Sequence, residues 1–188
     1  DYAASEIKRR AHNTPVNFGF IGGSMAANVQ AVSYILEHWW PAIKEFSPDS
    51  KLFLAGSVSN NELLQQLTFF DENIVKLGFV DDLADFYRQI DVALNPVVVA
   101  GGLNFKSVEA VFYGKHLLTN PLGQKCLGES FPCEVIESPK QLTDVVGQIE
   151  ANAHADLNKR RKLQQLAIKQ FGNRQACRDI VSHLNFVA

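Results

Sequence analysis

The stretch NPVVVAGGLNFKSVEAVFYGK, residues 95–115, changes character twice within a short distance. An apolar run leads into Gly101 and Gly102, and a helical pattern that carries Lys106 and Glu109 begins directly after them. The pattern predicts a buried strand, a glycine turn, and a helix whose first turns hold a cation and a carboxylate. A strand–turn–helix unit of this kind is a building block of α/β domains.

Strand-like and helix-like segments alternate along the rest of the chain, without a hairpin signal between them. Strands are expected at residues 16–21, 51–55, 73–77, 91–99, 116–119 and 134–136. These strands are apolar throughout, which is typical of a parallel sheet covered by helices on both faces. The sequence therefore predicts an α/β fold: a single Rossmann-like domain with a doubly wound parallel sheet, its core at about 14–138 and a helical tail at about 139–188.

Helices are expected at residues 29–43, 60–67, 82–90 and 106–113, and over most of 139–186. Pro41 is expected to kink or end the first helix near Trp40, because proline has no amide hydrogen and restricts the residue before it. Asn60 is a candidate N-cap of the second helix. Residues 120–127 are expected to form an exposed loop, and the basic run 159–162 a solvated helix face.

The composition is that of an ordinary globular chain, with 46% hydrophobic and 20% charged residues. A net charge of −2 gives no reason to expect nucleic acid as a partner, and no apolar run approaches the ~20 residues that cross a bilayer. The three cysteines form no C-x-x-C pair and indicate neither a disulfide framework nor a zinc site. Because the chain begins at Asp1 and its only methionine is Met25, we expect a piece of a longer cytoplasmic protein.

Open α/β sheets bind ligands beyond the carboxyl ends of their strands, so the turns there carry the functional signal. The first turn lacks G-x-G-x-x-G, and the second strand ends in Ala55, Gly56 and Ser57 where a dinucleotide site would have an acidic residue. The sequence also lacks a P-loop and the G-x-S-x-G elbow of hydrolases. These observations argue against the commonest ligands and reactions of such sheets.

The turn at Gly101 and Gly102 suits a phosphate group better. Free amide groups over residues 103–107, together with the helix dipole, would form an anion site. Lys106 adds a full positive charge, and Glu109 lies on the same helix face, where it could accept hydrogen bonds from vicinal hydroxyls. The alternative interpretation is a surface ion pair after a plain loop.

Four stretches, taken in order, resemble a known family. They are VNFGFIGGSMAANVQAVSYILEHWWPAI, KLFLAGSV, NIVKLGFVDDLADFYRQIDVALNPV and GGLNFKSVEAVFYGKHLLTN. Over roughly residues 16–125 they resemble the C-terminal, donor-binding domain of GT-B glycosyltransferases, closest to the retaining family 4 (glycosyl transferases group 1). The most specific parts are LGFVDDLADFY and KSVEAVFYG.

The resemblance implies a set of donor-binding residues. They are Gly22, Gly23, Ser24, Gly78, Phe79, Val80, Gly102, Leu103, Asn104, Phe105, Lys106, Ser107 and Glu109. Glu109 matches the glutamate that holds the ribose, the turn at residues 78–80 matches the place where the base packs, and residues 22–24 match the glycine turn beside the diphosphate. The chain departs from the family at two points: Gly101 occupies the position of a first glutamate, and residues 22–28 hold no Arg or Lys.

The implied function is the binding of a UDP-, GDP- or ADP-linked sugar for transfer of a hexosyl group to a glycan or lipid-linked acceptor. The acceptor domain would precede this piece, so the piece alone is expected to be inactive. No cofactor and no metal are expected, and no catalytic residue is assigned; the implied location is the cytoplasm or the inner face of the membrane. The alternatives are a non-catalytic nucleotide- or glycan-binding module and, as a third option, a sugar-nucleotide epimerase.

Overall fold

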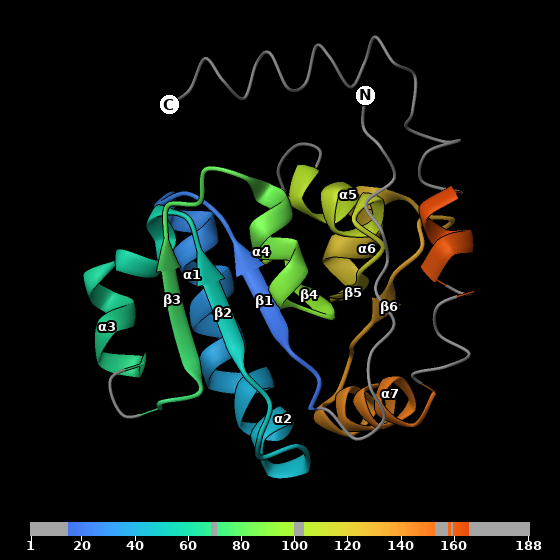
Figure 1. The fold of residues 1–188 in the computed structure, drawn as a ribbon, viewed down its shortest axis with the longest axis horizontal. Helices are drawn as coiled ribbons and strands as arrows, with labels where there is room; N and C mark the ends of the chain where they lie inside the picture. Colours follow the sequence, from blue (N-terminus) through green and yellow to red (C-terminus); the bar gives the residue numbers. More distant parts are fainter. Residues whose placement is uncertain (1–14, 69–70, 100–103, 153–157, 159, 166–188) are drawn as a thin grey trace, which may run out of the picture.

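Parallel strands form one sheet in the order β3-β2-β1-β4-β5-β6 in the computed structural model, which describes residues 15–68, 71–99, 104–152, 158 and 160–165 (Figure 1). The strands are β1 (Phe18–Ile21), β2 (Leu52–Ala55), β3 (Ile74–Gly78), β4 (Val92–Asn95), β5 (His116–Thr119) and β6 (Glu134–Val135). Every neighbouring pair is parallel. The chain therefore winds outward from β1 in one direction and from β4 in the other, and the predicted doubly wound sheet is confirmed.

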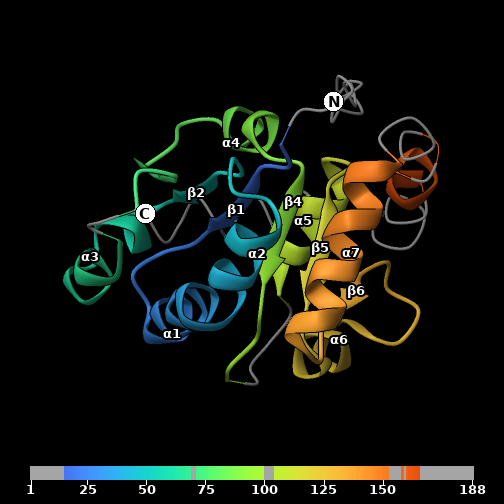
Figure 2. The same ribbon diagram turned by 90° about the horizontal axis from the view of Figure 1, so that it is seen from below.

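Helices cover both faces of this sheet. They are α1 (Ala26–Tyr34), α2 (Trp40–Phe46), α3 (Glu62–Thr68), α4 (Leu83–Gln89), α5 (Phe105–Phe112), α6 (Pro121–Leu127) and α7 (Pro139–Ala151). The helices α1 and α2 lie on the opposite side of the sheet from α4 (Figure 2). Alternate strand residues supply the two cores: Phe18 and Leu54 face α1, α2 and α7, whereas Phe53 and Ala93 face α4 and α5. Burial on both faces explains why the central strands β1, β2 and β4 are mainly apolar, whereas β3 at the edge carries an exposed Lys76.

Helix α4 packs unusually close to β1 because Gly19 has no side chain. A Cβ atom there would lie 2.7 Å from Ile90 and 2.8 Å from the ring of Phe86. Both neighbours are about 1% exposed, so neither has room to retreat. This close packing fixes α4 over the strand that ends at the candidate site.

The regular α-helix is interrupted near Trp40, in agreement with the prediction for Pro41: a π-helical turn (Ile35–Trp39) follows α1, and α2 begins at Trp40 with the proline in its first turn, where a missing amide hydrogen costs little. Two other local predictions need correction. Asn60 ends a short 3₁₀ turn, and Asn61 caps α3 instead by accepting a hydrogen bond from the Leu63 amide at 3.0 Å. The expected loop at residues 120–127 contains α6.

The segment at residues 160–165 is helical and attaches to the end of α5. Arg160 is only 5% exposed and its Nε atom donates to the carbonyl of Gly114. The Gln164 amide donates to the carbonyl of Phe112 at 2.6 Å. Arg160 is therefore buried at the C-terminal end of α5, whereas Arg161 and Lys162 of the same basic run are exposed, as predicted for a solvated helix face. No helix in the described part of the chain is long and apolar enough to cross a membrane.

Candidate functional site

The turns that follow β1, β2 and β3 are bonded to one another at one edge of the sheet. The Gly22 amide donates to the carbonyl of Ala55 at 3.0 Å, the Val58 amide to that of Gly22 at 3.2 Å, and the Gly56 amide to that of Gly78 at 2.6 Å. Gly56 has a φ of 81°, and a Cβ atom there would lie 2.3 Å from the carbonyl oxygen of Gly22. Only glycine fits this position, so the sequence forces the three turns together.

The side chain of Lys106 extends to the turn after β1 from α5, the helix that follows the neighbouring strand β4. It lies in the first turn of α5, and its Nζ atom donates to the Asn28 side chain in α1. The same atom lies 4.7 Å from the centre of the Phe20 ring in β1. Asn28 in turn donates to the carbonyl of Gly23 at 3.0 Å. The cation therefore sits beside the glycine turn after β1, where the sequence itself supplies no Arg or Lys.

Burial controls the charge of this lysine. It lowers the pKa of Lys106 to about 8, and the nearby Glu109 carboxylate opposes that shift. The ammonium form still predominates at neutral pH, but it has lost much of its hydration. An anion arriving beside it would restore the lost stabilisation and raise the pKa again.

Glu109 also lies away from bulk solvent, one turn further along α5. Burial raises the pKa of its carboxyl group, while the charge of Lys106 and a hydrogen bond with the Tyr87 side chain lower it. Both charged side chains are half-buried, and the ammonium group is directed to Asn28. Neither side chain is therefore freely solvated, as both would be in an exposed surface ion pair.

The end of β4 is fastened to α5 by buried polar groups. The Asn95 side-chain amide donates to the Ser107 hydroxyl at 2.6 Å, and Thr119 donates to the Asn95 carbonyl at 2.8 Å. The Ser107 side chain is thus occupied inside the protein, and its main-chain amide donates to the carbonyl of Asn104 at 3.0 Å. Asn104 is the N-cap of α5 and Phe105 its first residue, one residue before the predicted start. Gly102 and Leu103, also predicted to contact a ligand, lie outside the described residues.

The turn after β3 exposes a flat apolar side chain at the same edge. Gly78 has a φ of 67°, and the next residue, Phe79, is 80% exposed. Val80 instead packs against the core under α4. Because Gly56 bonds to Gly78, this turn belongs to the same cluster as the glycine turn after β1. At that glycine turn the Ser24 amide donates to the Ser57 hydroxyl at 2.9 Å.

Two residues of the arrangement were missed from the sequence, Asn28 and Tyr87. Asn28 follows the glycine turn in the first turn of a helix, so its polar side chain was a usable signal. Tyr87 gave no such signal in the sequence, because its position in α4 follows the apolar spacing of ordinary core residues. Its contact with Glu109 depends on how α4 packs against α5.

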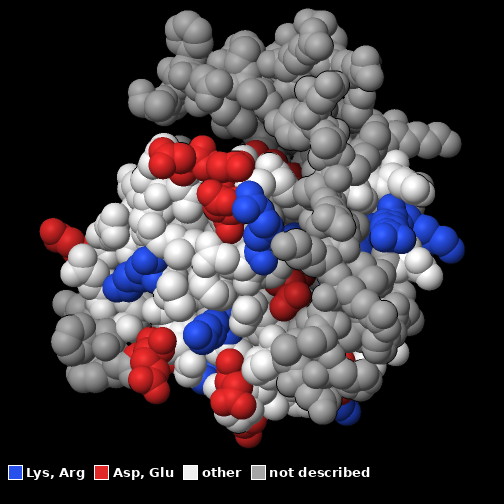
Figure 3. Space-filling view, in the orientation of Figure 1, with Lys and Arg blue, Asp and Glu red and all other residues white. Residues whose placement is uncertain are grey.

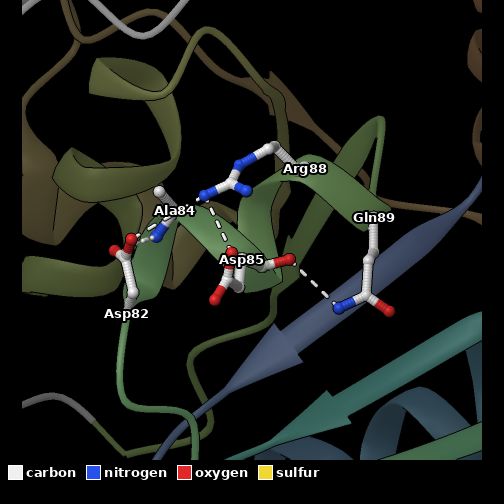
Figure 4. A network of polar contacts seen from close by, with 5 residues as sticks. All are labelled: Asp82, Ala84, Asp85, Arg88 and Gln89. Atoms are coloured by element: carbon white, nitrogen blue, oxygen red, sulfur yellow. Dashed lines mark hydrogen bonds and ion pairs between the residues drawn. The ribbon is translucent and has the colours of Figure 1, made fainter.

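Acidic side chains also gather near the start of α4, beside a basic group (Figure 3). Asp82 caps the helix by accepting from the Ala84 amide at 2.8 Å. Arg88 lies 2.8 Å from Asp85 and 3.7 Å from Asp82, and Gln89 donates to the Asp85 carbonyl (Figure 4). Asp82 therefore acts as the N-cap of α4, and Arg88 balances the negative charge of Asp82 and Asp85. These contacts account for the charged group without a ligand.

The strand order and the position of the polar cluster define a Rossmann-like doubly wound domain with its candidate site at the switch point between β1 and β4. The chain belongs to the glycosyl transferases group 1 family, whose model matches residues 15–152. No curated protein sequence matches the chain significantly.

Solved structures share the fold. HepE from Anabaena, in complex with UDP, is 14% identical with a TM-score of 0.68; the match covers 91% of this chain and 49% of HepE. TarM, known from S. aureus, is 12% identical with a TM-score of 0.69, covering 92% of this chain and 36% of TarM. WaaG, a glycosyltransferase involved in lipopolysaccharide biosynthesis, is 17% identical with a TM-score of 0.56, covering 81% and 43%. The chain thus spans half or less of each of these proteins.

Proposed function

We propose that this chain is the donor-nucleotide-binding domain of a glycosyltransferase that uses a nucleotide-diphosphate sugar. Family membership and the UDP complex of HepE support the proposal. The main supporting observation is the position of Lys106. Its side chain extends from the start of α5, and its ammonium group donates to Asn28 beside the glycine turn. A cation at a helix N-terminus, facing a glycine turn, suits a diphosphate.

Each part of the cluster takes one part of the donor in this proposal. The diphosphate lies between the glycine turn at residues 22–24 and the start of α5, with main-chain amides at the start of that helix as donors. Glu109 accepts hydrogen bonds from the ribose hydroxyls. The base packs at residues 78–80, where Phe79 offers an exposed ring. Lys106 neutralises the charge that grows on the diphosphate as the sugar leaves.

The remaining parts of the proposal concern the whole protein. A second domain supplies the acceptor site, and the sugar is a hexose passed to a glycan or lipid-linked acceptor. The reaction takes place in the cytoplasm or at the inner face of the membrane, and the scheme uses no metal or cofactor. Because the acceptor site lies elsewhere, the 188-residue chain alone binds donor but transfers no sugar.

The test is a calorimetric titration of the chain with UDP, GDP and ADP, repeated on Lys106→Ala and Glu109→Ala. One diphosphate should bind; Lys106→Ala should weaken it without changing the weaker binding of the nucleoside, and Glu109→Ala should weaken both. The exposed Lys140 and Glu129 provide matched control variants, whose replacement by alanine should change nothing. Failure of all three nucleotides to bind at millimolar concentration would contradict the proposal.

The alternative is a non-catalytic nucleotide- or glycan-binding module, for which Gly101 in place of the first glutamate is the supporting observation. The two functions differ in one assay. A full-length protein that binds the diphosphate sugar but neither transfers nor hydrolyses it, whatever the acceptor offered, would favour the module.

A further inference from the structure

The side chain of Asn28 connects the two parts of the proposed diphosphate site. Its nitrogen donates to the main-chain carbonyl of Gly23 at 3.0 Å, and its oxygen accepts a hydrogen bond from the Lys106 ammonium group. The first partner lies in the glycine turn after β1, and the second lies on α5, 78 residues away from Asn28 in the sequence. One neutral side chain in α1 therefore joins the turn to the cation.

These two partners allow the side-chain amide of Asn28 a single orientation. A carbonyl oxygen needs a donor and an ammonium group needs an acceptor, so a reversed amide would present the wrong atom to both. The side chain also lies directly over Gly22, where a Cβ atom would come within 2.9 Å of its Cγ and Nδ2 atoms. Gly22 is itself held by the Val58 amide, which donates to its carbonyl. The acceptor oxygen therefore has a fixed place beside the glycine turn.

Lys106 depends on such a partner because its side chain is long and a second group attracts it. Glu109 lies three residues further along the same helix, and its charge favours the ammonium form. Within the described part of the chain the two side chains nevertheless form no ion pair, and the ammonium group bonds to Asn28 beside the buried ring of Phe20. An ammonium group has three hydrogens, so the bond to Asn28 leaves others for an anion.

We propose that Asn28 is a positioning residue for the donor diphosphate: it holds the Lys106 ammonium group beside the glycine turn without cancelling its charge. A carboxylate at this position would hold the cation but neutralise it, and an apolar side chain would not hold it at all. This inference rests on the proposed donor-binding function. The competing view is that Asn28 only shapes the turn, through its bond to Gly23 and its packing over Gly22.

The test measures the affinity of the chain for UDP, GDP or ADP, whichever the unmodified chain binds most tightly. Asn28→Ala should lower this affinity about tenfold, because the cation loses a hydrogen bond and is no longer held beside the turn. In a Lys106→Ala background the same change should cost less than about twofold, because Asn28 acts through the ammonium group. Asn152→Ala is the matched control and should change nothing: Asn152 also donates to a main-chain carbonyl, that of Gln148 at 2.9 Å, but at the end of α7.

The pH profile of binding adds a readout that the shape of the turn would not alter. Asn28→Asp keeps the size of the side chain, and its carboxylate should raise the pKa of Lys106. The tenfold fall in affinity expected for the unmodified chain between pH 7 and pH 9 should then shrink to less than about threefold.

Three results would each overturn the inference and leave donor binding intact. They are unchanged affinity in Asn28→Ala, an undiminished effect of that change in the Lys106→Ala background, and a pH profile of Asn28→Asp parallel to that of the unmodified chain. If the unmodified chain binds none of the three nucleotides, the proposed function fails and this inference fails with it.

Discussion

Raising the pH above neutrality should weaken diphosphate binding because it removes the charge of Lys106. With a pKa of about 8, the amine is about 90% charged at pH 7 and about 10% charged at pH 9. Apparent affinity scales with the competent fraction, so it should fall about tenfold, or ~1.4 kcal/mol, over this range. A lysine at the ordinary value of 10.5 would stay charged at both pH values and would give almost no change.

The assay is calorimetric or fluorescence titration of the bound nucleoside diphosphate between pH 7 and pH 9. Lys106→Arg is the control, since guanidinium does not titrate in this range. It should give a flat profile after the ionisation of the nucleotide itself, common to both proteins, is subtracted. Glu109→Gln should move the midpoint below pH 8, because the carboxylate favours the charged amine. Parallel profiles for the unmodified protein and Lys106→Arg would refute the reasoning.

Two further predictions concern stability. Gly56→Ala forces a side chain into a positive-φ conformation and to 2.3 Å from the carbonyl oxygen of Gly22, so it should cost about 3 kcal/mol or more of unfolding free energy in urea denaturation. Gly23→Ala, whose Cβ would meet nothing closer than 3.8 Å, should cost far less, and equal losses would contradict the argument. Asp82→Ala removes the cap on the Ala84 amide and should cost ~1 kcal/mol in thermal unfolding; Asp82→Asn should retain most of it.

The sheet was predictable because β1, β2, β4 and β5 are buried, mainly apolar runs that end at a glycine or polar turn. The helix α6 was not predicted, although its signals are present. Asn120 caps it by accepting from the Gly123 amide at 2.9 Å, and Pro121 occupies the first turn, where proline is favoured. Gly123 is a glycine for a packing reason, since a Cβ atom there would lie 2.0 Å from the Thr119 hydroxyl.

The candidate site was predictable only in its parts. The sequence places Lys106 and Glu109 on one helix face, and their spacing alone permits a surface ion pair. What separates the two interpretations is burial, and burial depends on α1 and α4, which lie far away in the sequence. The contacts of Lys106 with Asn28 and Tyr87 span 78 and 19 residues of sequence respectively. Local patterns carry no information about such pairs.

The absence of Arg and Lys from residues 22–28 is compensated by the topology of the sheet. In the order β3-β2-β1-β4-β5-β6, the carboxyl ends of β1 and β4 are neighbours. A basic side chain can therefore lie beside the turn after β1 whether it belongs to the helix after β1 or to the helix after β4. Lys106 takes the second route, and Asn28 occupies the first as its hydrogen-bond partner. Moving the charge to α5 also places it three residues from Glu109, so a single helix would hold the groups for both diphosphate and ribose. A consequence is that displacement of α5 should weaken binding of both parts of the donor together, whereas changes in the turn after β1 should affect the diphosphate alone.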